Sequence, residues 1–438
     1  MPMRQRTSAL GRLMLAGLFA VAPRLFVSIA VHGLAHDTGA PRTLFAITHK
    51  RDLDAFAPLP RLLGHRGWRA LTSDVHFAMR ADSFQPGFLA RVVQHPGWFA
   101  RLLRPISVGP VLRAVGVHPL DSLHFRPAET WLREALMAEG DVVLGTLLAP
   151  EALASIAAAA GDDPAALAQR PLSALLAWRY FRPLQQQLGS ELFRGPARRR
   201  AEARVLASAK RQLAELAAWL RAGGSVYTSP EGRLSPDGRL GPVRAGMLRL
   251  LRGAPADTRV LPIAIVYDFM TTARPRMWVD CAPALEGGAQ LTVRELESRV
   301  RAAWLAAARF TCTQLATGLL VQSHETLDSP VRAEELAAGV RAWAAQLAAN
   351  GRHVDPGLLS EAGARRRVSR YLRYAERRGL LRRHSAAFSL VPGALRLPDA
   401  AAAGAASADA DLGYRSSPLQ YAWAEAQEML GLRVPAPS

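Results

Sequence analysis

Strand-like and helix-like segments alternate along the chain from about residue 40 to residue 285. The strand candidates are apolar or β-branched runs, and the helix candidates carry apolar residues at helical spacing. The clearest strands are residues 42–48, 225–228, 259–267 and 277–281, and the clearest helices are residues 197–222 and 247–251. This alternation is the pattern of an α/β domain, and we predict that fold class.

Composition indicates a folded, basic protein. Half of the 438 residues are apolar, which is enough for a sizeable core. Lys and Arg outnumber Asp and Glu by 55 to 36, and the resulting charge of +19 favours an anionic partner such as phospholipid headgroups, phosphorylated substrates or nucleic acid. Cys281 and Cys312 are far apart and form no CxxC motif, so we expect neither a disulfide framework nor a metal site. A reducing compartment is the simpler interpretation.

The N-terminal region contains two apolar runs, residues 13–22 and 25–35, behind a basic flank. Each run is shorter than the roughly 20 residues that span a bilayer as a helix. A secretory signal peptide fits the basic flank and the first run. A pair of amphipathic helices in the membrane interface fits both runs, and an ordinary buried helix is the third possibility. We favour the interfacial helices and assign residues 1–40 to them.

Residues 225–246 have the pattern of a site loop at the end of a strand. A short β-prone run leads into Pro230-Glu231-Gly232, and a Ser235-Pro236-Asp237-Gly238 turn follows before a helix begins near Ala245. Proline and glycine at these places favour turns over continued strand or helix.

A second candidate site follows the strand at residues 42–48, where His49 and Asp54 have the spacing His-x4-Asp. On one continuous helix the two side chains would point about 140° apart. They meet if His49 lies in the loop before a helix and Asp54 in its first turn. Asp54 would then accept the Nδ1 proton of His49 and leave Nε2 as a general base. The alternative is an ordinary loop histidine beside an Asp at a helix N-terminus.

The rest of the chain has a more helical character. We expect a buried strand at residues 141–148, a helical insertion at about 127–188, and a helical C-terminal region at 289–438 with an Arg-rich helix at 365–383. Residues 91–104 alternate apolar and Arg residues, which suits a surface facing lipid or phosphate, or a half-buried helix with snorkelling arginines. Residues 400–410 are of low complexity and predict a loop or a linker.

Several enzyme classes lose their usual support because their motifs are missing. The sequence has no GxSxG, GxxxxGK[ST], HExxH or GxGxxG pattern. These absences argue against serine hydrolase, P-loop NTPase, zincin and Rossmann functions.

The His-x4-Asp pair followed by Pro230-Glu231-Gly232 resembles the glycerolipid acyltransferase family, which includes 1-acylglycerol-3-phosphate acyltransferases. The first motif of that family is NHxxxxD and its third is close to FPEGTRS, followed by a glycine, a basic residue and another glycine, matched here by Gly238, Arg244 and Gly246. Thr48 stands in place of the usual Asn, and Arg233-Leu234 in place of Thr-Arg. The second motif, GxxFxxR-like, is best matched at residues 189–194 and alternatively at 116–126. The resemblance covers about residues 10 to 285.

The resemblance implies an αβα domain at residues 41–288 around a mixed, mostly parallel sheet. It implies that His49, oriented by Asp54, removes a proton from an acceptor hydroxyl, which attacks the thioester of acyl-CoA or acyl carrier protein. Glu231 and Gly232 would shape the acceptor site, and Arg194, Arg233 and Arg244 would hold an anionic headgroup. No metal or cofactor is expected beyond the acyl donor as co-substrate.

We therefore expect a membrane-associated enzyme that acylates a lysophospholipid or related glycerolipid at the cytoplasmic face of the cell membrane, as a peripheral or monotopic protein. A basic membrane-peripheral scaffold of the same fold with a decayed catalytic pair is the alternative. A nucleic-acid binder is suggested only by the arginines, since no recognition module is evident, and we expect no nucleic-acid partner.

Overall fold

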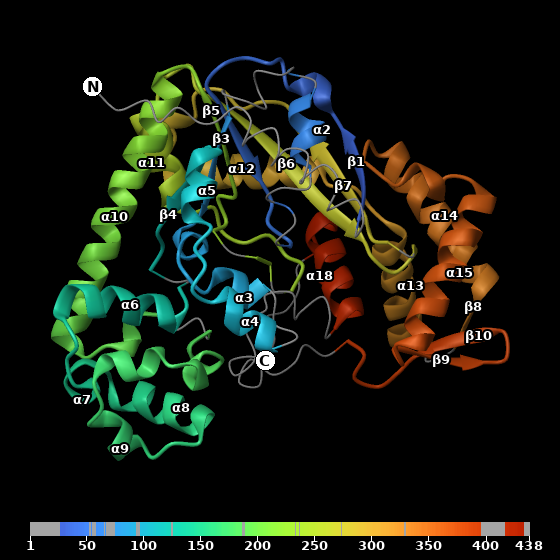
Figure 1. Ribbon diagram of the computed structural model, residues 1–438. Coiled ribbons are helices and arrows are strands. Elements are labelled where there is room, and N and C mark those ends of the chain that lie inside the picture. The colour runs from blue at the N-terminus through green and yellow to red at the C-terminus, as the bar shows by residue number, and fades with distance from the viewer. Residues whose placement is uncertain are drawn as a thin grey trace. The chain divides into compact units, whose positions relative to one another are not determined.

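The structure is a computed structural model (Figure 1), and it describes residues 27–51, 54, 58–64, 66, 75–92, 97–123, 126–185, 189–232, 234–235, 237–272, 274–327, 330–395 and 417–432. The described residues belong to two compact units. The middle unit comprises the described residues of His76–Trp219. The sheet unit comprises the described residues before and after this stretch.

The sheet unit is built on five strands in the order β1-β7-β6-β2-β5. Their bounds are β1 Ser28–His32, β2 Thr43–Ile47, β5 Ser225–Thr228, β6 Arg259–Asp268 and β7 Arg276–Cys281. β2 runs parallel to both β5 and β6, and β1 runs parallel to β7. Only the β6–β7 pair among these five strands is antiparallel. The predicted α/β class with a mixed, mostly parallel sheet is therefore confirmed.

The central strands are apolar because helices and neighbouring strands remove them from water. Every residue of β2 and β5 is buried, as is every residue of β6 after Arg259. Such continuous apolar runs are typical of parallel strands covered on both faces. Helix α12 (Val293–Ala307) begins with a capping box between Thr292 and Glu295. Near its end, the buried Trp304 donates its indole N–H to the carbonyl of Ala46 in β2 at 2.9 Å.

The C-terminal helices belong to the sheet unit. They are α11 Ala245–Gly253, α12, α13 Cys312–Leu327, α14 Ala333–Ala349, α15 Glu361–Arg377 and α18 Pro418–Leu430. Ion pairs with buried carboxylates join this region to the strands: Arg309 lies 2.5 Å from Asp280 of β7, and Arg367 lies 3.9 Å from Asp268 of β6. Residues 400–410 lie outside the described residues.

The prediction of one Arg-rich helix over residues 365–383 is wrong for residues 378–383. α15 ends at Arg377, Gly379 has a φ of +68° there, and two strands of a three-stranded sheet follow. That sheet consists of β8 Val331–Arg332, β9 Leu381–His384 and β10 Ala387–Leu390. β9 and β10 form a hairpin because Leu381, Phe388 and Leu390 are apolar and buried while the arginines between them face solvent.

The middle unit combines two parallel strands with helices. The strands are β3 Val75–Arg80 and β4 Val117–Leu120, and the helices are α3 Phe88–Val92, α4 Gly97–Leu103, α5 Gly109–Ala114, α6 Ala128–Glu139, α7 Leu144–Leu147, α8 Pro150–Ala160, α9 Pro164–Ala168 and α10 Gly195–Arg221. Buried residues from Ala128 to Val205 form one apolar core around Trp131 and Tyr180. This core overlaps the predicted insertion at 127–188 and extends into α10.

The buried strand predicted at residues 141–148 is wrong. Residues Leu144–Leu147 form the single helical turn α7. Leu144 and Leu147 are three positions apart, so a helical turn places both on one side, where they are buried in the core of the middle unit. A strand would place them on opposite faces.

The predicted pair of N-terminal helices does not extend to residue 40. Residues 28–32 form strand β1, because all five of them pair with residues 276–280 of β7, and Leu34–His36 form a short 3₁₀ turn. Residues 1–26, where the rest of this prediction falls, lie outside the described residues. No helix in the described ranges combines the length and apolarity needed to cross a membrane.

The Trp304 hydrogen bond gives a direct test of how α12 holds β2. We expect Trp304→Phe to lower the free energy of unfolding by about 1–3 kcal/mol, because it removes a buried hydrogen bond and some packing volume. Guanidinium denaturation followed by circular dichroism measures the change. Trp98→Phe is the matched control at an exposed tryptophan, and it should change stability by less than about 0.5 kcal/mol. Equal stability of both variants would contradict this packing.

Candidate active site

Two segments far apart in sequence meet at one edge of the sheet. β2 and β5 are parallel neighbours, so the loops that follow them leave the sheet at the same edge. His49 follows β2, and Glu231 follows β5. The backbone N–H of His49 donates to Glu231 Oε1 at 2.8 Å, and the N–H of Ser235 donates to the His49 carbonyl at 2.9 Å. The two loops are therefore bonded to each other in both directions.

Glu231 is the central connection of this site. Its side chain is fully buried, and Oε2 accepts a second hydrogen bond from the N–H of Gly241 at 2.6 Å. Burial raises the pKa of the Glu231 carboxyl, while the Lys50 charge and the two backbone donors oppose the rise. Gly232 follows in the left-handed region with a φ of +69°, which glycine adopts without strain. Glu231 thus fixes the loop, and Gly232 turns the chain.

His49 and Asp54 lie next to each other without a hydrogen bond. The distance from His49 Nδ1 to Asp54 Oδ2 is 3.8 Å, and Nδ1 makes no hydrogen bond with any residue that the structure describes. The His49 side chain is 17% exposed, so solvent or a substrate has limited access to the ring. This contact is close enough for an ion pair and too long for a hydrogen bond.

The Asp54 carboxylate is held by three donors of its own. It accepts from the N–H of Lys50 at 2.5 Å, from the N–H of Arg51 at 2.7 Å, and from the hydroxyl of Tyr267. Burial, then the nearby Asp54 charge, raises the pKa of Tyr267 well above its ordinary value, so this hydroxyl stays protonated as a donor. Asp54 therefore organises the turn after His49 in addition to facing its ring. Tyr267 lies on β6, and no sequence motif marks it.

Thr48, which stands where the resembled family has Asn, has a local role in the sheet. Its hydroxyl oxygen accepts from the N–H of Ile265 at 2.8 Å and lies 3.4 Å from the carbonyl of the same residue. The side chain thus continues the pairing between β2 and β6 beyond the end of β2. It fixes the direction in which the chain enters His49.

The four predicted arginine positions have different surroundings. Arg244 donates from Nε to the Glu231 carbonyl at 3.3 Å, so it lies beside the predicted site. Arg233 lies outside the described residues. Arg194 is exposed in the middle unit, and its Nε donates to the Leu148 carbonyl at 2.9 Å. The alternative Arg126 is buried in the same unit between Asp121, Glu134 and the ring of Trp131.

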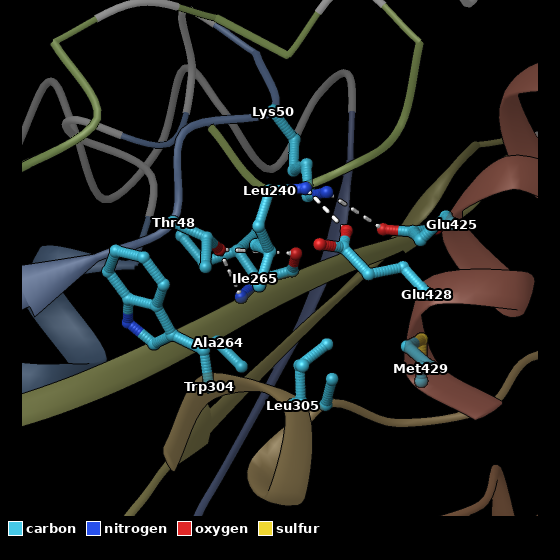
Figure 2. Close-up of a pocket in the computed structure, with 11 residues that line it drawn as sticks. Thr48, Lys50, Leu240, Ala264, Ile265, Trp304, Leu305, Glu425, Glu428 and Met429 are labelled. Carbon is cyan, nitrogen blue, oxygen red and sulfur yellow. Dashed lines mark hydrogen bonds and ion pairs between the residues drawn. The ribbon is translucent and has the colours of Figure 1, made fainter. Parts of the chain in front are cut away.

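The structure also shows contacts that the sequence did not suggest, between helix α18 and the loop that follows Glu231 (Figure 2). The buried Lys50 donates to the carbonyl of Gly238 and lies 3.5 Å from a carboxylate oxygen of Glu425. The N–H of Leu240 donates to Glu428 at 2.6 Å, and Arg301 bonds both Glu428 and the Leu240 carbonyl. The only signal in the sequence is that Lys50 is one of two lysines in the chain.

A small buried cavity lies among these charged groups. It is lined by Thr48, Lys50, Leu240, Trp304, Glu425 and Glu428 among others, and its volume of about 10 Å³ is close to the space of one water molecule. It is too small for a substrate. In the part of the chain that the structure describes, no group of three or more His, Cys, Asp or Glu side chains is placed to hold a metal ion.

No protein-family model matches the chain, and the search of curated proteins found no match.

Gly238 allows a test of whether α18 supports the loop. Gly238 has a φ of +89°, and a Cβ there would collide with the backbone carbonyl of Tyr421 in α18. Gly351 has a similar φ of +73° and open space around it. We expect Gly238→Ala to destabilise the protein by about 2 kcal/mol more than Gly351→Ala, because only Gly238→Ala adds a steric clash to the backbone strain. Equal melting temperatures would show that α18 does not constrain this loop.

The substitution Glu231→Gln gives a second test, because glutamine has nearly the same shape as glutamate but only one acceptor oxygen in its side chain. In Glu231→Gln an amide NH₂ must face the backbone N–H of either His49 or Gly241, which leaves a buried donor without an acceptor. We expect a loss of about 1–3 kcal/mol in the free energy of unfolding, measured by guanidinium denaturation. Glu286→Gln is the exposed control and should be near neutral. A stable Glu231→Gln protein would contradict the bridging role of this carboxylate.

Proposed function

We propose that this protein is an acyltransferase that moves an acyl group from a thioester to a hydroxyl of a lysophospholipid or related glycerolipid. The observation that carries the proposal is that His49, Asp54 and Glu231, the residues of the two motifs, lie together at the ends of neighbouring parallel strands. The motifs are about 180 residues apart in sequence, so their meeting is independent support for reading them as one site.

In the proposed reaction, His49 Nε2 takes the proton of the acceptor hydroxyl as its oxygen attacks the thioester carbonyl. A carbon–oxygen bond forms, the carbon–sulfur bond breaks, and the imidazolium returns the proton to the leaving thiolate. No covalent acyl-enzyme is needed. Asp54, fixed by its three donors, lies beside Nδ1 and favours the tautomer with the proton on that nitrogen. The proposal requires this 3.8 Å contact to shorten to a hydrogen bond when the substrates are bound.

The substrates that fit this proposal carry phosphate. Acyl-CoA or acyl carrier protein supplies the acyl group, and the acceptor is an anionic lysolipid at the cytoplasmic face of the cell membrane. Arg244 lies beside Glu231 and is our first candidate for the headgroup, with Arg233 and Arg194 as further candidates. The charge of +19 favours attachment to an anionic membrane.

A catalytically inactive scaffold of the same fold is the second candidate. It is favoured by one observation, the absence of a hydrogen bond between His49 and Asp54. In this alternative, Asp54 serves only to hold the turn through Lys50, Arg51 and Tyr267.

Release of free thiol from acyl-CoA distinguishes the two candidates. With lysophospholipid vesicles and acyl-CoA, we expect the wild-type protein to release thiol and to form an acylated lipid. His49→Ala should lower kcat by about 10²–10⁴-fold, because it removes the general base. The exposed His36→Ala is the matched control and should keep the wild-type rate. Mass spectrometry of the lipids identifies the acceptor that is acylated.

Two outcomes would contradict the proposed activity. One is a wild-type protein that releases no thiol with any glycerolipid acceptor, and the other is a His49→Ala variant as active as wild type. Either result favours the scaffold.

A further inference from the structure

Helix α4 of the middle unit, labelled in Figure 1, buries a small residue and exposes its large apolar ones. Its buried residue is the small Ala100, which packs with Ala90 and Phe181. Trp98 and Leu102 lie on the opposite side of the helix, and their exposed fractions are 67% and 61%. A helix in a soluble domain normally buries its large apolar residues and exposes its polar ones. Packing within the middle unit therefore does not explain why these large apolar side chains are on α4.

Exposed apolar side chains are concentrated in the stretch of chain that forms α4 and the beginning of α5. The patch comprises Trp98, Phe99, Leu102, Ile106 and Val111, which we call the α4–α5 patch. These residues are all at least 40% exposed and lie within one short stretch of the chain. They account for almost half of the large apolar side chains that are exposed among the described residues. Such a concentration marks an interaction surface more often than scattered exposed residues do.

The charges within the patch are all positive. Residues 97–116 contain Arg101, Arg104 and Arg113 and no Asp or Glu. Arg101 and Arg113 are exposed, whereas Arg104 is paired with Glu129 of α6 at 3.1 Å. The surface thus combines tryptophan, aliphatic side chains and arginine without a carboxylate of its own. This composition is typical of surfaces that lie in the interface of an anionic bilayer.

A hollow in this surface adds to its apolar character. It has an open volume of about 650 Å³ and is lined by Gly97, Trp98, Arg101, Leu102, Pro105 and Trp178. The two tryptophans provide apolar walls, and Arg101 supplies the only charge of the lining residues. The hollow offers space for part of a lipid with its phosphate beside Arg101.

We infer that the α4–α5 patch docks onto the surface of an anionic phospholipid bilayer, with Trp98 and Leu102 inserted and Arg101 and Arg113 at the phosphates. A second copy of this chain fits the patch less well. In a twofold dimer the same patch meets itself, so arginines would meet arginines without a carboxylate between them. This inference concerns membrane attachment alone and does not depend on the chemistry at His49.

Vesicle flotation with the full chain tests this inference without any acyl donor. The probes are vesicles of phosphatidylcholine with about one third phosphatidylglycerol, and vesicles of phosphatidylcholine alone. We expect Trp98→Glu/Leu102→Glu to reduce binding to the anionic vesicles by about tenfold or more, because two inserted apolar side chains are lost. The matched control is Met137→Glu/Leu206→Glu, which changes two exposed apolar residues of the same unit outside the patch. It should bind like wild type apart from a small effect of the added charge.

Arg101→Gln/Arg113→Gln should weaken binding to the anionic vesicles only. Equal binding of the patch variant and the control variant would overturn the inference. So would loss of self-association in the patch variant with unchanged vesicle binding, since that result identifies the patch as an interface between copies. Because no acyl donor is present, failure here leaves the acyltransferase proposal untouched, and failure of the thiol assay leaves this one untouched.

Discussion

The buried carboxylate of Glu231 is the interaction on which the candidate site depends. It accepts one hydrogen bond from the backbone of His49 and one from the backbone of Gly241, and so it joins the loops that follow β2 and β5. Nearly every residue has a backbone N–H donor, whatever its side chain. A buried carboxylate that accepts from two such donors is costly to replace, because its loss leaves both donors without an acceptor. The positions of His49 and Gly232 follow from this single side chain.

Helix α18 in the C-terminal region supports the same site. Lys50 is buried next to His49 and lies close to Glu425 of α18, and Leu240 is bonded to Glu428 of the same helix. A buried charge requires a partner, so removal of either Lys50 or Glu425 leaves the other uncompensated. The candidate active site is therefore coupled to a helix almost 400 residues further along the chain, which explains why the C-terminal region belongs to the sheet unit.

Much of the fold could be predicted from local pattern. β2, β5, β6 and α10 follow the predicted ranges closely, because their apolar runs or helical spacing extend over the whole element. The predictions failed where the apolar run is short. The sequence of β1 is equally compatible with a helix until β7 pairs with it, and the 141–148 run is apolar in a way that fits either a strand or a turn of helix.

The sequence by itself determined the α/β class, the two motifs and their order, since strand and turn propensities are local properties of residues. Only the tertiary structure decided that His49 and Glu231 are in contact, that Tyr267 holds Asp54, and that α18 closes on Lys50. These contacts depend on strand order and on helix packing across hundreds of residues. The spacing of residues in one segment does not determine strand order or helix packing, because both depend on burial and strand pairing over the whole unit.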